Sequence, residues 1–126
     1  MGPSVFLSFA IEDKPLVELF RGQARNRHSA LTFRDYSIKE AVDGAWKRHA
    51  ERLIRASTAT LCLVGASTWR SEPVDWEIRK SAQLDKRILA VFLCATTVRV
   101  PPALHDLGVT PMPWSISAIE RRLHGQ

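Results

Sequence analysis

The sequence has few of the residues that build the common phosphate, metal and disulfide sites. Its six glycines form neither GxGxxG nor GxxxxGK[ST], which argues against a Rossmann dinucleotide site and against an NTPase. The GxSxG and HExxH motifs are also absent. The four histidines fall on separate predicted elements and show no convergent metal-ligand spacing. We therefore expect no metal site and no phosphate-binding loop.

Cysteine is scarce as well. Cys62 and Cys94 lie within or at the end of apolar, strand-like runs, and neither belongs to a CxxC or Cys/His motif. Free cysteines are among the residues most often buried. The sequence thus predicts two small buried residues rather than ligands or a disulfide.

Long apolar segments and strong charge bias are missing too. No run approaches the roughly 20 residues of a membrane helix, and the first nine residues do not resemble a signal peptide. The expectation is a soluble, cytoplasmic protein that makes no membrane contact. The 18 Lys and Arg against 13 Asp and Glu leave a net charge of +5, which suits an anionic partner. Aromatic residues are not interleaved with the basic ones, so nucleic acid is not the expected partner.

What is present is one domain, residues 1–126, in which strand patterns alternate with helix patterns. The third and fourth strands are continuous apolar runs, as expected when helices cover both faces of a parallel sheet. Such alternation predicts an α/β fold with an open, mostly parallel sheet and helices on both faces. The expected strands cover residues 5–9, 31–33, 59–64 and 88–93, and the later helices cover about 44–56, 74–84 and 116–123.

Ligands of open α/β sheets bind beyond the carboxyl ends of the strands. The loops of interest therefore follow Phe9, Phe33, Val64 and Leu93, and polar and aromatic residues gather in the first three. A phosphoacceptor receiver domain shares this alternation. It needs an aspartate after the third strand, where this chain has Gly65.

Three segments carry a resemblance to a known family. They are Val-Phe-Leu-Ser-Phe at 5–9, Asp-Tyr-Ser-Ile-Lys-Glu at 35–40 and Val-Asp-Trp-Glu-Ile at 74–78. Over roughly residues 4–93 the chain resembles the TIR-like domain of bacterial and archaeal proteins, including the TIR-like subunit of Thoeris anti-phage systems. The resemblance implies a flavodoxin-like fold and an NAD glycohydrolase or ADP-ribosyl cyclase. Such an enzyme breaks the nicotinamide–ribose bond and often forms a cyclic ADP-ribose signal, with NAD as substrate and no cofactor.

The resemblance also assigns roles to residues. Glu77 matches the catalytic glutamate of the family. Six further residues fall on motif positions around the nucleotide pocket: Phe6, Ser8, Phe9, Asp35, Tyr36 and Trp76. TIR enzymes commonly have a tryptophan four residues before the glutamate, where this chain has Pro73, so either Trp69 or Trp76 is expected to supply the aromatic ring.

The chemistry by itself also favours a glutamate. Breaking the nicotinamide–ribose bond develops oxocarbenium character on the ribose, which a fixed carboxylate stabilises. Nicotinamide leaves without needing a proton on a glycosidic oxygen, so one carboxylate is sufficient.

Each assignment has a structural alternative. Glu77 can be a first-turn helix acid paired with Lys80, and Asp35 with Tyr36 can simply form a turn. Trp46 is expected in the core, and Trp114 is expected to anchor the last helix. At the level of function, the alternative is a non-catalytic TIR-like interaction module. The expected partners are NAD, further copies of the chain, and an effector or sensor protein.

Overall fold

The computed structural model describes residues 4–27, 31–34, 45–94 and 98–123. Its sheet has four parallel strands in the order β2-β1-β3-β4. They are β1 (Ser4–Phe9), β2 (Thr32–Arg34), β3 (Ala59–Val64) and β4 (Arg87–Phe92). The open parallel sheet expected from the sequence is confirmed, and β3 is a central strand buried along its whole length.

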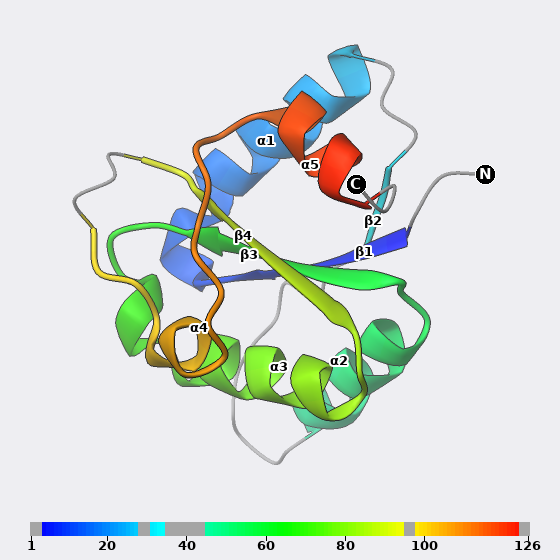
Figure 1. Cartoon of the computed structure of the whole chain (residues 1–126), viewed down its shortest axis with the longest axis vertical. Helices are drawn as coiled ribbons and strands as arrows, with labels where there is room; N and C mark the ends of the chain where they lie inside the picture. The colour runs from blue at the N-terminus through cyan, green and yellow to red at the C-terminus, as the bar shows by residue number, and fades with distance from the viewer. Residues whose placement is uncertain (1–3, 28–30, 35–44, 95–97, 124–126) are drawn as a thin grey trace.

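Helices cover both faces of the sheet (Figure 1). One face carries α1 (Lys14–Asn26) and α5 (Ile116–Leu123). The other carries α2 (Ala45–Arg55), α3 (Glu72–Gln83) and the short α4 (Pro102–Asp106). The sequence did not predict α4, because it spans five residues inside a proline-punctuated stretch. Within the described ranges, every helix is too short or too polar to span a bilayer.

The start of α3 lies two residues before the predicted position. Ser71 is the N-cap residue, and its Oγ accepts a hydrogen bond from the Val74 N–H at 3.3 Å. Pro73 therefore occupies the second helical position. Its missing N–H is harmless there, because the first turn has no intrahelical partner for it.

Alternation along β1 divides the core into two layers. Val5, Leu7 and Phe9 pack with Phe20 of α1, on the face that α1 and α5 cover. Phe6 points the other way and packs with Trp46 of α2. Trp46 is thus a core residue, as predicted.

The prediction that both cysteines are buried is confirmed for one of them only. Cys62 is buried beneath α3 and α4, whereas Cys94 is exposed, so the predicted burial of Cys94 is wrong. The reason is that Cys94 lies two residues beyond the end of β4.

Trp114 packs its ring against Phe20 at a centroid distance of 5.6 Å, and its indole N–H donates to the Gln23 side-chain oxygen at 2.5 Å. It thereby joins the segment before α5 to α1.

Candidate functional site

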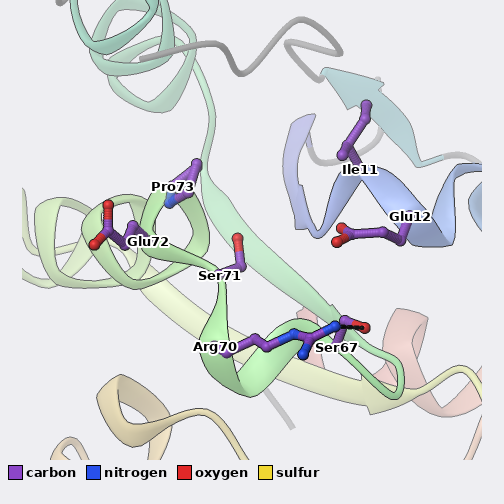
Figure 2. A pocket seen from close by; sticks show the side chains of 7 residues that line it. All are labelled: Ile11, Glu12, Ser67, Arg70, Ser71, Glu72 and Pro73. Atoms are coloured by element: carbon purple, nitrogen blue, oxygen red, sulfur yellow. Dashed lines mark hydrogen bonds between the residues drawn. The ribbon is translucent and has the colours of Figure 1, made fainter.

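The sheet order determines where a ligand site can form. From β1 the chain continues to β2 on one side, while β3 lies on the other side of β1. The segments that follow β1 and β3 therefore diverge and leave a crevice between them at the carboxyl edge. A hollow of about 320 Å³ lies there. It is lined by Ile11 and Glu12 after β1, and by Ser67, Arg70, Ser71, Glu72 and Pro73 after β3 (Figure 2).

Asp13 lies beside this hollow with an unexpected role. It occupies the N-cap position of α1, but its side chain makes no capping hydrogen bond. Its carboxylate instead accepts a hydrogen bond from the Thr68 hydroxyl at 3.2 Å. Burial raises the pKa of the Asp13 carboxyl, and the hydrogen bond from Thr68 partly opposes that rise.

Glu77 is fully buried in the second turn of α3. The Ser8 hydroxyl of β1 donates a hydrogen bond to Glu77 Oε1 at 2.7 Å. The structure thus contradicts the alternative of an exposed first-turn acid paired with Lys80. The Lys80 ammonium lies 3.7 Å from a carboxylate oxygen of Glu51 in α2.

A pair of hydroxyls continues the polar layer between the sheet and α3. Thr60 Oγ1 of β3 and Ser81 Oγ of α3 are 2.7 Å apart, and Ser81 also donates to the Glu77 carbonyl at 2.8 Å. Sequence reasoning did not identify Thr60 as a member of the site. A signal was available only for its partner Ser81, which lies four residues after Glu77 and therefore on the same inner face of α3.

The hollow and the buried carboxylate are close neighbours along α3. Pro73 lines the hollow and precedes Glu77 by four residues. Positions four apart share a helix face and are separated by about 6 Å of rise. Glu77 therefore lies one turn deeper into the fold than the wall of the hollow.

The two candidate tryptophans take different positions. Trp69 lines an adjoining hollow of about 240 Å³, and the Arg99 guanidinium lies 4.3 Å from the centre of its ring. Trp76 packs edge-on against Trp46 of α2, with centroids 5.3 Å apart and an interplanar angle of 71°. Trp76 thus lies against α2 and lines neither of these two hollows.

The other predicted site residues lie in different parts of the fold. Phe6 and Ser8 lie on the side of the sheet that faces α2 and α3, whereas Phe9 is buried in the layer beneath α1. The structure does not bring the Phe9 side chain to Glu77, because adjacent strand residues point to opposite faces. Asp35 and Tyr36 lie outside the described residues.

Comparison with known families supplies the deciding observation. Residues 6–97 match the family described as "Thoeris protein ThsB, TIR-like domain". The chain belongs to this TIR-like family. The resemblance drawn from the three sequence segments is therefore confirmed.

Solved structures support the fold of this TIR-like domain. The crystal structure of the TIR domain of the Toll-related receptor TRR-2 from Hydra magnipapillata is similar, with a TM-score of 0.64 and 12% identity over 95% of this chain and 90% of that chain. The TIR domains of the activated Roq1 resistosome give a TM-score of 0.52 and 18% identity over 72% of this chain and 57% of that chain. At such identities the likeness concerns the fold alone. The curated proteins contain no match to the chain.

Proposed function

We propose that this TIR-like domain cleaves the nicotinamide–ribose bond of NAD in anti-phage defence. The observation that carries the proposal is the placement of Glu77. This acid occupies the motif position of the catalytic glutamate and accepts a hydrogen bond from Ser8. It also lies one helical turn from the hollow at the carboxyl edge of the sheet.

The chemistry asks little of the protein beyond a fixed negative charge. As the bond breaks, its electron pair leaves with the nicotinamide nitrogen, and positive charge develops on the ribose. The Glu77 carboxylate stabilises that charge, while Ser8 holds the carboxylate in one orientation. Water then attacks the ribose to give ADP-ribose, or the adenine attacks it to give a cyclic product.

The burial of Glu77 adds a requirement. Its side chain is fully buried, so NAD reaches the carboxylate only after part of the fold around Glu77 moves. Such an opening suits an enzyme that is inactive until it assembles with copies of itself or with a sensor or effector protein. Specific activity should then rise with protein concentration, which a dilution series with parallel mass measurements tests.

The decisive experiment is incubation of the concentrated protein with NAD, followed by chromatography of nicotinamide, ADP-ribose and cyclic ADP-ribose. Glu77→Gln keeps the side-chain volume and an oxygen that accepts from Ser8. We expect it to lower nicotinamide release by about 100-fold or more, as for the loss of other electrostatic stabilisers. Glu18→Gln, an exposed acid on α1, is the matched control and should retain activity. Equal cleavage by the wild type and Glu77→Gln would show that Glu77 is not the catalytic residue.

A paired substitution tests which tryptophan meets the substrate. Trp69→Ala should raise the KM for NAD severalfold with little loss of stability, because Trp69 borders the site from the short 3-10 helix Thr68–Arg70 after β3. Trp76→Ala should mainly destabilise the fold, by about 3 kcal/mol, because the ring packs on Trp46. Kinetics and thermal melts of both variants provide the comparison. A destabilised Trp69→Ala beside a stable Trp76→Ala with a raised KM would reverse the assignment.

A non-catalytic interaction module is the second candidate function. Two observations favour it: the full burial of Glu77, and the proline at position 73, which offers no aromatic face for nicotinamide. Absence of nicotinamide release from concentrated, assembled wild-type protein would decide for this reading.

A further inference from the structure

We propose that Asp13 is a positioning residue that holds the segment after β3 against the segment after β1 and so keeps the two walls of the hollow in place. The proposal rests on the proposed function only for the identity of the ligand, NAD. Its geometry concerns three residues: Asp13, Thr68 and Gly65.

One hydroxyl joins three points of the chain. The Gly65 N–H donates to Thr68 Oγ1 at 2.7 Å, and Thr68 Oγ1 donates to Asp13 Oδ2 at 3.2 Å. The Thr68 hydroxyl therefore acts as acceptor and donor at once, which fixes its orientation. Because Thr68 is only 1% exposed, water cannot readily replace either partner.

Gly65 allows this contact because it has no side chain. A Cβ atom at position 65 would overlap both carboxylate oxygens of Asp13. No positive φ is involved, since Gly65 is absent from the residues with a left-handed backbone. The glycine is required by the close approach of Asp13, so its place after β3 serves the link between the two segments.

The link lies at the base of both walls. Ile11 and Glu12, which form one wall, immediately precede Asp13. On the other wall, Ser67 immediately precedes Thr68, and the Ser71 N–H donates to the Thr68 carbonyl at 3.1 Å. Breaking the link would therefore release both walls from each other, even though none of the three linked residues lines the hollow itself.

A matched pair of substitutions at position 68 tests the proposal. Thr68→Val keeps the shape and removes the hydroxyl, whereas Thr68→Ser keeps the hydroxyl. We expect Thr68→Val to speed hydrogen exchange of the Gly65 amide by about tenfold or more, because that N–H loses its acceptor. The KM for NAD should rise by about tenfold while kcat changes much less. In Thr68→Ser both the exchange rate and the KM should stay close to the wild-type values. A role in stability alone would lower the Tm of Thr68→Val and leave the KM unchanged, which would overturn the proposal.

A second experiment tests the contact between Gly65 and Asp13 without NAD. Gly65→Ala should lower the Tm of the wild type, because the new methyl group displaces the carboxylate. In an Asp13→Ala background the same methyl group meets no carboxylate, and the further fall in Tm should be at most half as large. An equal fall in both backgrounds would show that the link does not exist as described.

The proposed function and this inference fail in different ways. The proposed function fails if the wild type releases no nicotinamide. In that case hydrogen exchange of the amides from Ser67 to Glu72 decides the inference, because it reports on the wall of the hollow directly. Exchange in Thr68→Val that is unchanged from the wild type would overturn the inference whether or not NAD is cleaved.

Discussion

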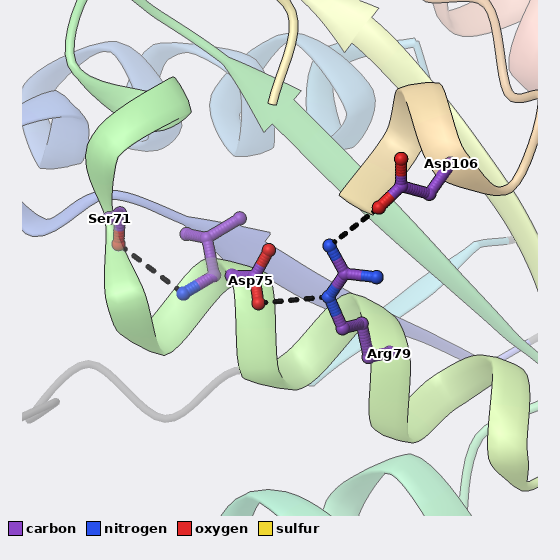
Figure 3. A network of polar contacts seen from close by, with 5 residues as sticks. Ser71, Asp75, Arg79 and Asp106 are labelled. Atoms are coloured by element: carbon purple, nitrogen blue, oxygen red, sulfur yellow. Dashed lines mark hydrogen bonds and ion pairs between the residues drawn. The ribbon is translucent and has the colours of Figure 1, made fainter. Parts of the chain in front are cut away.

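Helix α3 carries two polar arrangements on opposite faces, and water reaches only one of them. On the inner face Glu77 and Ser81 meet hydroxyls of the sheet, all fully buried. On the outer face the Arg79 guanidinium donates to Asp75 at 3.0 Å and to Asp106 of α4 at 2.9 Å (Figure 3). The inner contacts measure 2.7–2.8 Å and the outer ones 2.9–3.0 Å, which are the usual distances for oxygen and nitrogen donors, so neither face has unusually short contacts.

Solvent makes the difference. On the outer face the hydrogen bond from Arg79 lowers the pKa of the Asp106 carboxyl, and the hydrogen bond to Asp75 raises the pKa of Arg79. Water screens these charges and competes for both partners, so such pairs stabilise a fold little. On the inner face a lost partner leaves a polar group with no water to replace it. The buried contacts on the inner face of α3 therefore stabilise the fold, whereas the exposed contacts on its outer face add little to stability.

The largest effect should come from truncating the inner acid. Glu77→Ala removes a fully buried side chain and leaves the Ser8 hydroxyl without its acceptor. We expect a loss of about 2–5 kcal/mol in the free energy of unfolding, measured by urea denaturation. Glu72→Ala, an exposed acid on the same helix, should change stability far less. A Glu77→Ala variant as stable as the wild type would remove the distinction between the faces.

The next effect concerns the pair of buried hydroxyls. Thr60→Val should lower stability by about 1–3 kcal/mol, because the buried Ser81 hydroxyl loses a partner. The double variant Thr60→Val with Ser81→Ala should lose less than the sum of the single variants, since the first change already breaks the shared hydrogen bond. Strictly additive losses in a denaturation cycle would show that the two hydroxyls act independently.

The effect of Asp13 on stability should be intermediate, because its side chain is only partly buried. It should appear as a dependence of the Tm on pH. Burial raises its pKa above the usual 3.8 of a free aspartate. A raised pKa means that the fold favours the protonated carboxyl, so the contribution of Asp13 to stability is fully present below pH 3.8 and is lost as pH rises through the folded-state pKa. Asp13→Asn cannot ionise and lacks this loss. The Tm of Asp13→Asn relative to the wild type should therefore increase as pH is raised above 3.8, and a decrease would contradict the direction of the shift.

The smallest effect should come from the outer face. Asp106→Ala removes one carboxylate from an exposed cluster, and the Arg79 guanidinium keeps Asp75. Thermal melts should show little change at low salt and less at high salt, because salt screens exposed charges. A large, salt-insensitive fall in Tm would show that this exposed cluster stabilises the fold as much as the buried contacts of the inner face do.

Much of the fold was predictable from local patterns. The apolar run at 59–64 predicted a buried parallel strand, and the structure confirms it as β3 between β1 and β4. The helical spacing around Trp46 predicted its place in the core. Boundaries were less accurate, because α3 begins after its N-cap residue Ser71, two residues before the predicted start. Cys94 was placed wrongly because an apolar run does not reveal where its covering helices end.

The sequence by itself determined the alternation of strands and helices, the residues of the core and the motif that contains Glu77, because these depend on the order of residue types along the chain. Only the tertiary structure decided which of these residues meet. Ser8 and Glu77 are 69 positions apart, and Asp13 and Thr68 are 55 apart. They touch because β1 lies beside β3 and α3 packs across both strands. The burial of Glu77 and the need for a glycine at position 65 follow from these long-range contacts, which no local pattern along the chain records.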